Sequence, residues 1–166
     1  MSPISGRSII VTGGASGIGE TAARLFAEND ALVTVADIST EAGEALAEEL
    51  SGKGCEVQFV TTGVADEAQV AAMVDAASVG SFVCIPLAAE YGEHGIRVNA
   101  IGPSTARTPM YLKLNPEYEK TVAATPALRR GSEPVEQAQA AMWLLSDAAS
   151  FVTGVTVPVD GGCLLY

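Results

Sequence analysis

A glycine-rich segment near the amino terminus constrains the fold more than any other feature of this sequence. The segment from Thr12 to Gly19 reads Thr-Gly-Gly-Ala-Ser-Gly-Ile-Gly, and it directly follows the short β-branched run 8–11. Such a run is typical of a buried parallel strand, and the residues after the glycines place apolar side chains at helical spacing. The pattern predicts a strand, a tight turn and a helix, the unit that begins a dinucleotide-binding fold.

The chemistry of a dinucleotide gives each glycine a role. Gly13 permits the tight turn, Gly17 omits a β-carbon that would block a diphosphate, and Gly19 lets the helix approach the strand. The free N–H groups at the start of the helix face the phosphates. We therefore expect this segment to supply cofactor contacts from Thr12, Gly13, Ser16, Gly17, Ile18 and Gly19.

A carboxylate after the second predicted strand indicates which dinucleotide is bound. The strand 31–36 ends in Asp37, eighteen positions after Gly19. A carboxylate there accepts both ribose hydroxyls and repels a 2′-phosphate. The nearest basic residues before it, Arg7 and Arg24, do not stand just after the strand, where a 2′-phosphate clamp is expected. These features predict NAD in preference to NADP.

The motif resembles the cofactor motif of the short-chain dehydrogenase/reductase family, Thr-Gly-x-x-x-Gly-x-Gly. Later segments also look like this family: its sixth strand, its Pro-Gly-x-x-x-Thr segment, and its last strand with the terminal turn match residues 95–101, 103–109 and 151–162. The resemblance covers residues 4–77 and 87–162. It implies an oxidoreductase that transfers hydride between NAD and a small alcohol or ketone.

The resemblance also implies cofactor contacts outside the glycine segment. Thr108 matches the family threonine near the nicotinamide amide, although a helix N-cap before Pro109 is an equal alternative. Val64 is a further candidate, but Gly63 stands where the family usually has an aspartate. Ser104 replaces a family glycine beside the nicotinamide. We therefore expect the adenosine half of the cofactor to bind better than the nicotinamide half.

The middle of the family's chain has no counterpart. Family members carry an Asn-Asn-Ala-Gly strand end, a catalytic serine and a Tyr-x-x-x-Lys motif on a long helix. No lysine stands four positions after any of the tyrosines, which are Tyr91, Tyr111, Tyr118 and Tyr166. In the family the tyrosine transfers a proton and the lysine lowers its pKa, so turnover should be weak or absent. Against a domain of about 250 residues, roughly 80 are missing. An incomplete record of a longer chain is the alternative.

The remaining sequence predicts a reduced α/β domain, a doubly wound, Rossmann-like parallel sheet spanning residues 1–166. In the first half, strands at 8–12, 31–36 and 55–60 alternate with helices at 18–29, 40–51 and 66–77. The second half is expected to contain a strand at 81–85, a short helix at 87–92, a strand at 96–101, a substrate lid at 110–130, a helix at 134–146 and a strand at 155–159. The side chains expected to face inward from the third and last helices are Val70, Met73, Val74, Ala77, Ala138, Ala141, Met142 and Leu145.

Composition excludes several classes of function. A net charge of −11 repels nucleic acid, and no apolar run approaches the ~18 residues of a membrane span. The start of the chain lacks the apolar region of a signal peptide, so we expect a cytoplasmic protein. Cys55, Cys84 and Cys163 are too widely spaced for a zinc site, and no metal is expected. The single histidine, His94, is expected in a surface loop.

Three functional hypotheses remain open. The first is an NAD-binding relative with little or no oxidoreductase turnover. The second is an enzyme with displaced chemistry, including a non-redox isomerase or cyclase, in which Tyr91 or Tyr118 acts as an acid. The third is a partner-binding pseudoenzyme. Because the missing helices pair family members into dimers, their loss should uncover apolar sheet, and we expect a homo-oligomer.

Overall fold

The first sheet is parallel and three-stranded, with the order β1-β2-β3. The computed structural model describes residues 2–76, 92–95, 97–113 and 116–165. The strands are β1 (Ser8–Thr12), β2 (Leu32–Asp37) and β3 (Val57–Thr61). Ile9 lies opposite Val33, which in turn lies opposite Val57, so one side of the sheet is a continuous β-branched surface. This surface forms the centre of the hydrophobic core.

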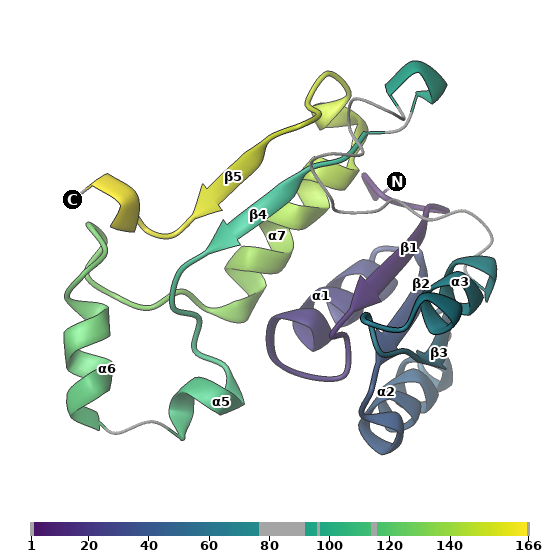
Figure 1. Cartoon of the computed structure of the whole chain (residues 1–166), viewed down its shortest axis with the longest axis horizontal. Helices are drawn as coiled ribbons and strands as arrows, with labels where there is room; N and C mark the ends of the chain where they lie inside the picture. Colours follow the sequence, from purple (N-terminus) through teal and green to yellow (C-terminus); the bar gives the residue numbers. More distant parts are fainter. Residues whose placement is uncertain (1, 77–91, 96, 114–115, 166) are drawn as a thin grey trace.

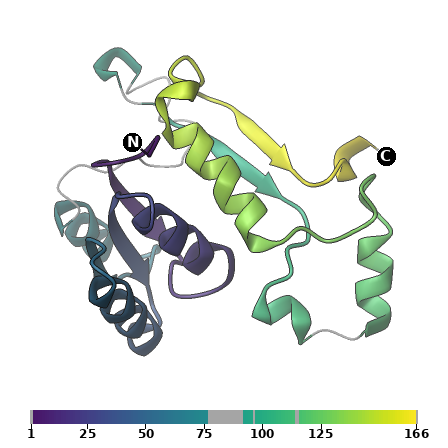
Figure 2. The ribbon, with the colours of Figure 1, turned by 180° about the vertical axis from the view of Figure 1, so that it is seen from behind.

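Helices cover both faces of this sheet (Figures 1 and 2). On the β-branched face lie α1 (Gly17–Ala27) and α2 (Thr40–Gly52), and on the other face lies α3 (Glu67–Ala76). The buried helix side chains of the core are Ala22, Ala23, Phe26, Ala27, Leu46 and Leu50. In α3, Met73 is buried and Val70 partly buried, whereas the side chains of Val74 and Ala77 lie outside the described residues. The helices and strands expected in this half are confirmed to within two residues at each end.

The second sheet pairs two parallel strands, β4 (Ala100–Pro103) and β5 (Thr156–Val159). The strand expected at 96–101 therefore begins later than the sequence indicated. Between residues 97 and 99, side-chain hydrogen bonds add to the backbone bond that the Gly154 N–H donates to the Val98 carbonyl at 2.8 Å. The Asn99 amide donates to the carbonyl of Val152 at 2.8 Å, and the hydroxyl of Thr153 accepts from the Val98 N–H at 3.1 Å.

Helix α7 (Pro134–Leu145) joins the two sheets, because it packs against β4 and β5 and also against α1. Pro134 occupies the first turn as expected, and the Glu136 carboxylate accepts the N–H of the N-cap residue Glu133 at 2.8 Å. Ala138 is fully buried in the same core as α1, and the other three expected inward residues, Ala141, Met142 and Leu145, pack against that core. Figure 2 shows α7 running beside α1 and across the second sheet.

The remaining described segments are short. Two helices, α5 (Pro109–Leu112) and α6 (Pro116–Ala123), occupy the stretch expected to form a lid, and three 3₁₀ turns are η1 (Gly92–His94), η2 (Asp147–Ala149) and η3 (Cys163–Leu165). The strand expected at 81–85 and the helix expected at 87–92 lie outside the described residues, except for Gly92. Within the described part of the chain, no helix has the length and apolar character needed to span a bilayer.

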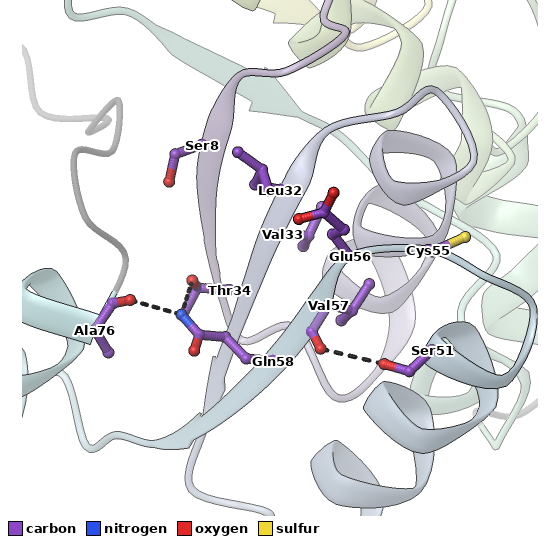
Figure 3. A pocket seen from close by; sticks show the side chains of 10 residues that line it. All are labelled: Ser8, Leu32, Val33, Thr34, Ser51, Cys55, Glu56, Val57, Gln58 and Ala76. Atoms are coloured by element: carbon purple, nitrogen blue, oxygen red, sulfur yellow. Dashed lines mark hydrogen bonds between the residues drawn. The ribbon is translucent and has the colours of Figure 1, made fainter.

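A hollow of about 520 Å³ lies at the amino-terminal ends of the first three strands (Figure 3). Its lining includes Ser8, Leu32, Thr34 and Gln58. The Gln58 amide donates to the Thr34 hydroxyl at 2.9 Å and to the carbonyl of Ala76 at 2.7 Å. Leu32 is 39% exposed. The sheet surface at this hollow is therefore mixed in polarity.

The contact between α1 and α7 predicts a site that does not tolerate a larger side chain. Ala138 is 0% exposed against the core, so Ala138→Leu should lower the free energy of unfolding by about 1–3 kcal/mol through overpacking. Gln139→Leu, at the exposed neighbouring position, is the matched control and should change it by less than about 0.5 kcal/mol. Urea denaturation followed by circular dichroism measures both. Equal effects would show that the helices are not tightly packed at Ala138.

Candidate functional site

The glycine turn between β1 and α1 is closed tightly by its backbone. Gly13 has a φ of +64°, a conformation that L side chains rarely adopt. A β-carbon on Gly19 would lie 2.1 Å from the carbonyl oxygen of Gly13, so only glycine lets the helix begin this close to the turn. The Gly14 N–H donates to the carbonyl of Ala36 at 3.3 Å, which attaches the turn to β2.

The amino-terminal end of α1 is open at its first turn. Ser16 is the N-cap residue, but its side chain makes no capping hydrogen bond. Thr12 and Ser16 are exposed, and the residues from Gly17 to Gly19 are partly exposed. The first N–H groups of a helix have no intrahelical partner and carry its positive dipole end. This end of α1 can therefore receive an anion.

Asp37 ends β2 beside the same turn. Its Oδ2 accepts the N–H of Ala15, inside the glycine turn, at 3.1 Å, and its Oδ1 accepts the N–H of Ser39 at 2.9 Å. Burial alone would raise the pKa of this carboxyl, but the N–H donors of Ser39 and Ala15 hold the pKa below its usual value. At neutral pH a negative charge therefore stands next to the turn.

Two exposed aliphatic side chains lie in the loops beside Asp37. Ile38 is 75% exposed and Val64 is 68% exposed. A β-carbon on Gly63, the residue before Val64, would lie 3.8 Å from Ile38 Cγ2, so the two loops are neighbours. Val64 was expected from the sequence as a cofactor contact, but Ile38 was not. The signal for Ile38 was an aliphatic residue in an otherwise polar loop directly after the strand.

Thr108 comes from the second half of the chain and meets the glycine turn. Its hydroxyl accepts the N–H of Tyr111 at 3.4 Å, so it is the N-cap of α5. A β-carbon on Gly17 would lie 3.2 Å from Thr108 Cγ2. The alternative raised from the sequence, a helix cap, is thus the role seen here, and the same residue also lies against the start of α1. The group that a β-carbon on Gly17 would strike in this structure is the Thr108 methyl.

The two arginines that precede Asp37 in the chain are engaged in ion pairs. Arg24 bonds to Glu20 at 2.9 Å and to Glu49 at 2.8 Å, which joins α1 to α2. The hydrogen bond that Arg24 donates to Glu49 is the largest influence and raises the pKa of Arg24. Arg7 pairs with Asp147, after α7.

Gln137 is a buried polar residue that was not expected from the sequence, and it lies beside the segment leading to Thr108. Gln137, in α7, is 0% exposed. Its Nε2 donates to Ser132 Oγ at 3.0 Å and to the carbonyl of Val159 at 2.7 Å, while its Oε1 has no partner. An unpaired buried acceptor costs about 1–3 kcal/mol. Glutamine usually lies at the surface, so the sequence carried no signal for this position.

Several residues considered from the sequence are not part of this arrangement. The side chains of Tyr91, Tyr118, His94 and Cys84 lie outside the described residues. Cys55 and Cys163 are free and partly buried. The structure therefore brings together the glycine turn, Asp37 and Thr108, and Tyr111 lies beside Thr108 in α5.

Comparisons with known proteins identify the family. A model described as short chain dehydrogenase matches residues 7–82, and one described as enoyl-(acyl carrier protein) reductase matches residues 83–163. A 2,5-dichloro-2,5-cyclohexadiene-1,4-diol dehydrogenase of Sphingobium indicum is 32% identical over 246 residues, covering 98% of both chains. A (+)-cis,cis-nepetalactol synthase of Nepeta racemosa is 28% identical and covers 97% of this chain and 93% of the relative.

A comparison with solved structures finds the same fold. A 3-oxoacyl-[acyl-carrier protein] reductase from Brucella melitensis, solved with bound NAD, has a TM-score of 0.84 at 22% identity, covering 97% of this chain and 92% of the other. The Sphingobium alignment spans 246 positions against 166 residues here, so about 80 positions of that relative have no counterpart. The chain is an internally shortened member of the short-chain dehydrogenase/reductase family, whose members are oxidoreductases that use nicotinamide cofactors.

Proposed function

We propose that this chain binds NAD in preference to NADP and retains little or no oxidoreductase turnover. The observation that carries the proposal is the Asp37 carboxylate, which accepts an N–H from within the glycine turn. This bond holds a negative charge at the point where the second strand of a dinucleotide fold meets the ribose. The fit of the cofactor is also supported by the open first turn of α1.

The residues that would hold the cofactor come from both halves of the chain. The N–H groups of Gly17, Ile18 and Gly19 face the diphosphate, with Thr12, Gly13 and Ser16 forming the turn before them. Each Asp37 oxygen accepts one backbone N–H and keeps a lone pair for a ribose hydroxyl. Val64 flanks the adenine, as does Ile38, and Thr108 contacts the nicotinamide amide. When bound, the cofactor supplies a hydride acceptor or donor.

Charge supports NAD over NADP. A 2′-phosphate would stand near the ionised Asp37, and hydrogen bonds keep that carboxyl charged. Arg7 and Arg24 are already paired with acidic side chains. Neither is available to compensate a phosphate without giving up its present partner.

The absence of a Tyr-x-x-x-Lys motif supports weak turnover. A positioned general acid or base contributes about 10²- to 10⁴-fold to a reaction rate. The sequence contains no Tyr-x-x-x-Lys motif, so this acid/base pair is missing. We therefore expect the chain to bind the cofactor but to convert substrate slowly or not at all.

A second candidate function is a non-redox reaction on the same fold. It is favoured by the relative from Nepeta racemosa, which carries the name of a synthase. A partner-binding pseudoenzyme is the third hypothesis. For each of them we propose a cytoplasmic, single-domain protein that self-associates and, if it is active, acts on a small molecule. We propose no nucleic-acid partner, because the net charge of −11 repels one.

The first prediction tests the role of Asp37 in cofactor choice. Asp37→Asn should weaken NADH binding about 10- to 100-fold, because it removes hydrogen bonds to a charged group, and should reduce the preference over NADPH. Asp30→Asn is the control, since Asp30 is exposed and asparagine tolerates its φ of +61°. Calorimetric titration measures both. Equal Kd values for NADH in the wild type and Asp37→Asn would contradict the proposal.

The same carboxylate makes a prediction about pH. Because the pKa of Asp37 is lowered, the group stays ionised as the pH falls from about 8 to about 5. The affinity for NADH should therefore be unchanged across this interval and fall only as the pH drops through the lowered pKa. Titrations with NADH at several pH values check this. An affinity for NADH that is lost near pH 6 would implicate a different group.

The third prediction concerns turnover. With NAD and a panel of secondary alcohols, the rate should be at least about 10²-fold below that of a relative that retains the Tyr-x-x-x-Lys motif. NADH formation followed by absorbance measures it, with the same relative as the positive control. A comparable rate would show that another group supplies the proton transfer. Product formed without NAD would favour the non-redox candidate.

A further inference from the structure

The buried amide of Gln137 connects both flanks of the segment that leads to Thr108. Among the described side chains that are less than 2% exposed and of large volume, Gln137 is the polar one. Its two donor hydrogens are directed to different parts of the chain, Ser132 on one side and Val159 on the other. Ser132 bonds to the segment 104–107, and Val159 pairs with Pro103, the residue just before that segment.

The link through Ser132 is made of four hydrogen bonds. Gln137 Nε2 donates to Ser132 Oγ at 3.0 Å, and Ser132 Oγ donates in turn to the carbonyl of Thr105 at 3.2 Å. The backbone completes the pairing, because Ser132 N–H donates to the same carbonyl at 2.9 Å and Arg107 N–H donates to the Ser132 carbonyl at 2.8 Å. The residue just before Thr108 is therefore held to the start of α7.

The link through Val159 reaches the other end of the segment. Val159 lies opposite Pro103 in the ladder of the second sheet, and its carbonyl accepts from Gln137 Nε2 at 2.7 Å. The next residue, Asp160, accepts the Ser104 hydroxyl on its carbonyl at 3.2 Å. The Gln137 side chain thus fixes the end of β5 relative to the start of the segment 104–107.

We infer that Gln137 is a positioning residue that holds Thr108 against the glycine turn for the nicotinamide half of the cofactor, an inference that rests on the proposed function. The methyl group of Thr108 lies 3.2 Å from the position that a β-carbon on Gly17 would take, and its place there depends on the path of residues 104–107. The contacts proposed for the adenosine half do not depend on this segment, since Asp37 ends β2 of the first sheet and Ile38 follows it. Gln137 should therefore affect one half of the cofactor and not the other.

The unpaired acceptor argues against a purely structural role. Gln137 Oε1 is buried without a hydrogen-bond donor, so an apolar side chain of similar length would remove an unfavourable group from the core. The glutamine instead keeps two donors on Ser132 and Val159.

The test compares Gln137→Met with Gln139→Met, its exposed neighbour on α7, in the full chain. Methionine keeps the length of the side chain and removes both donors. Hydrogen exchange of the backbone amides of Arg107 and Ser132 is measured first, without cofactor. Gln137→Met should speed this exchange about tenfold, and Gln139→Met should leave it unchanged.

Binding of two nucleotides then separates positioning from folding. The variants are titrated with NADH and with AMP, which carries only the adenosine half. Gln137→Met should weaken NADH binding about tenfold relative to AMP binding, which stays at its wild-type value. Ser132→Ala removes the link through Ser132 but leaves the bond to Val159, so it should weaken NADH binding relative to AMP by a smaller factor. Combined with Gln137→Met it should cost less than the sum of the two single losses, because both variants remove the Gln137–Ser132 hydrogen bond. Ser132→Ala also serves if the methionine variant fails to fold.

Each outcome decides the inference. Unchanged exchange at Arg107 and Ser132 would overturn it, as would faster exchange with an unchanged ratio of NADH to AMP affinity. Equal loss of NADH and AMP binding would show a structural role only and would also overturn it. If the wild type binds neither nucleotide, the proposed function fails, while faster exchange in Gln137→Met still supports the hold on residues 104–107.

Discussion

The packing of α1 against α7 is the interaction on which the arrangement of this protein depends. Among the described residues, the two sheets share no hydrogen-bonded strand pair. The helices join them instead, with Ala23 on α1 and Ala138 on α7 both fully buried in the common core. Small side chains at these positions let helices approach closely, and any larger group would separate the sheets. The exposed pair of Arg7 and Asp147 lies at the same junction, where a surface ion pair adds little.

This junction divides the candidate site into a local part and a dependent part. The glycine turn, Asp37 and Ile38 all lie at the carboxyl ends of β1 and β2, where the hydrogen bond from Ala15 to Asp37 holds the turn in place. Thr108 reaches the turn only because α7 places the second sheet beside α1. Gln137 adds a further step, since it connects α7 to the segment before Thr108. The adenosine side of a cofactor site therefore rests on local structure and the nicotinamide side on packing between the halves.

The charges of the chain limit which ligands can bind beside the glycine turn. The chain carries 20 acidic and 9 basic residues, and several arginines are paired within the fold. Glu49, bound by Arg24 and Lys53, has its pKa lowered to about 2, and Glu136, bound by Arg130, also to about 2. These pairs remain charged at any pH near neutrality. The positive end of α1 is thus where we propose that an anion binds, with the Asp37 carboxylate beside it proposed to disfavour a 2′-phosphate.

The sequence by itself determined the first half of this protein, because its signals are local. Glycine spacing, β-branched runs and helical periodicity act within about ten residues, so the strands, the helices and the place of Asp37 were all predictable. The tertiary structure decided the rest. The Asn99 side chain bonds to the backbone of Val152, Thr108 lies beside the position that a β-carbon on Gly17 would take, and Gln137 is buried in spite of its polarity. Each of these depends on residues far apart in the chain, and neither propensity nor spacing carries information about such contacts.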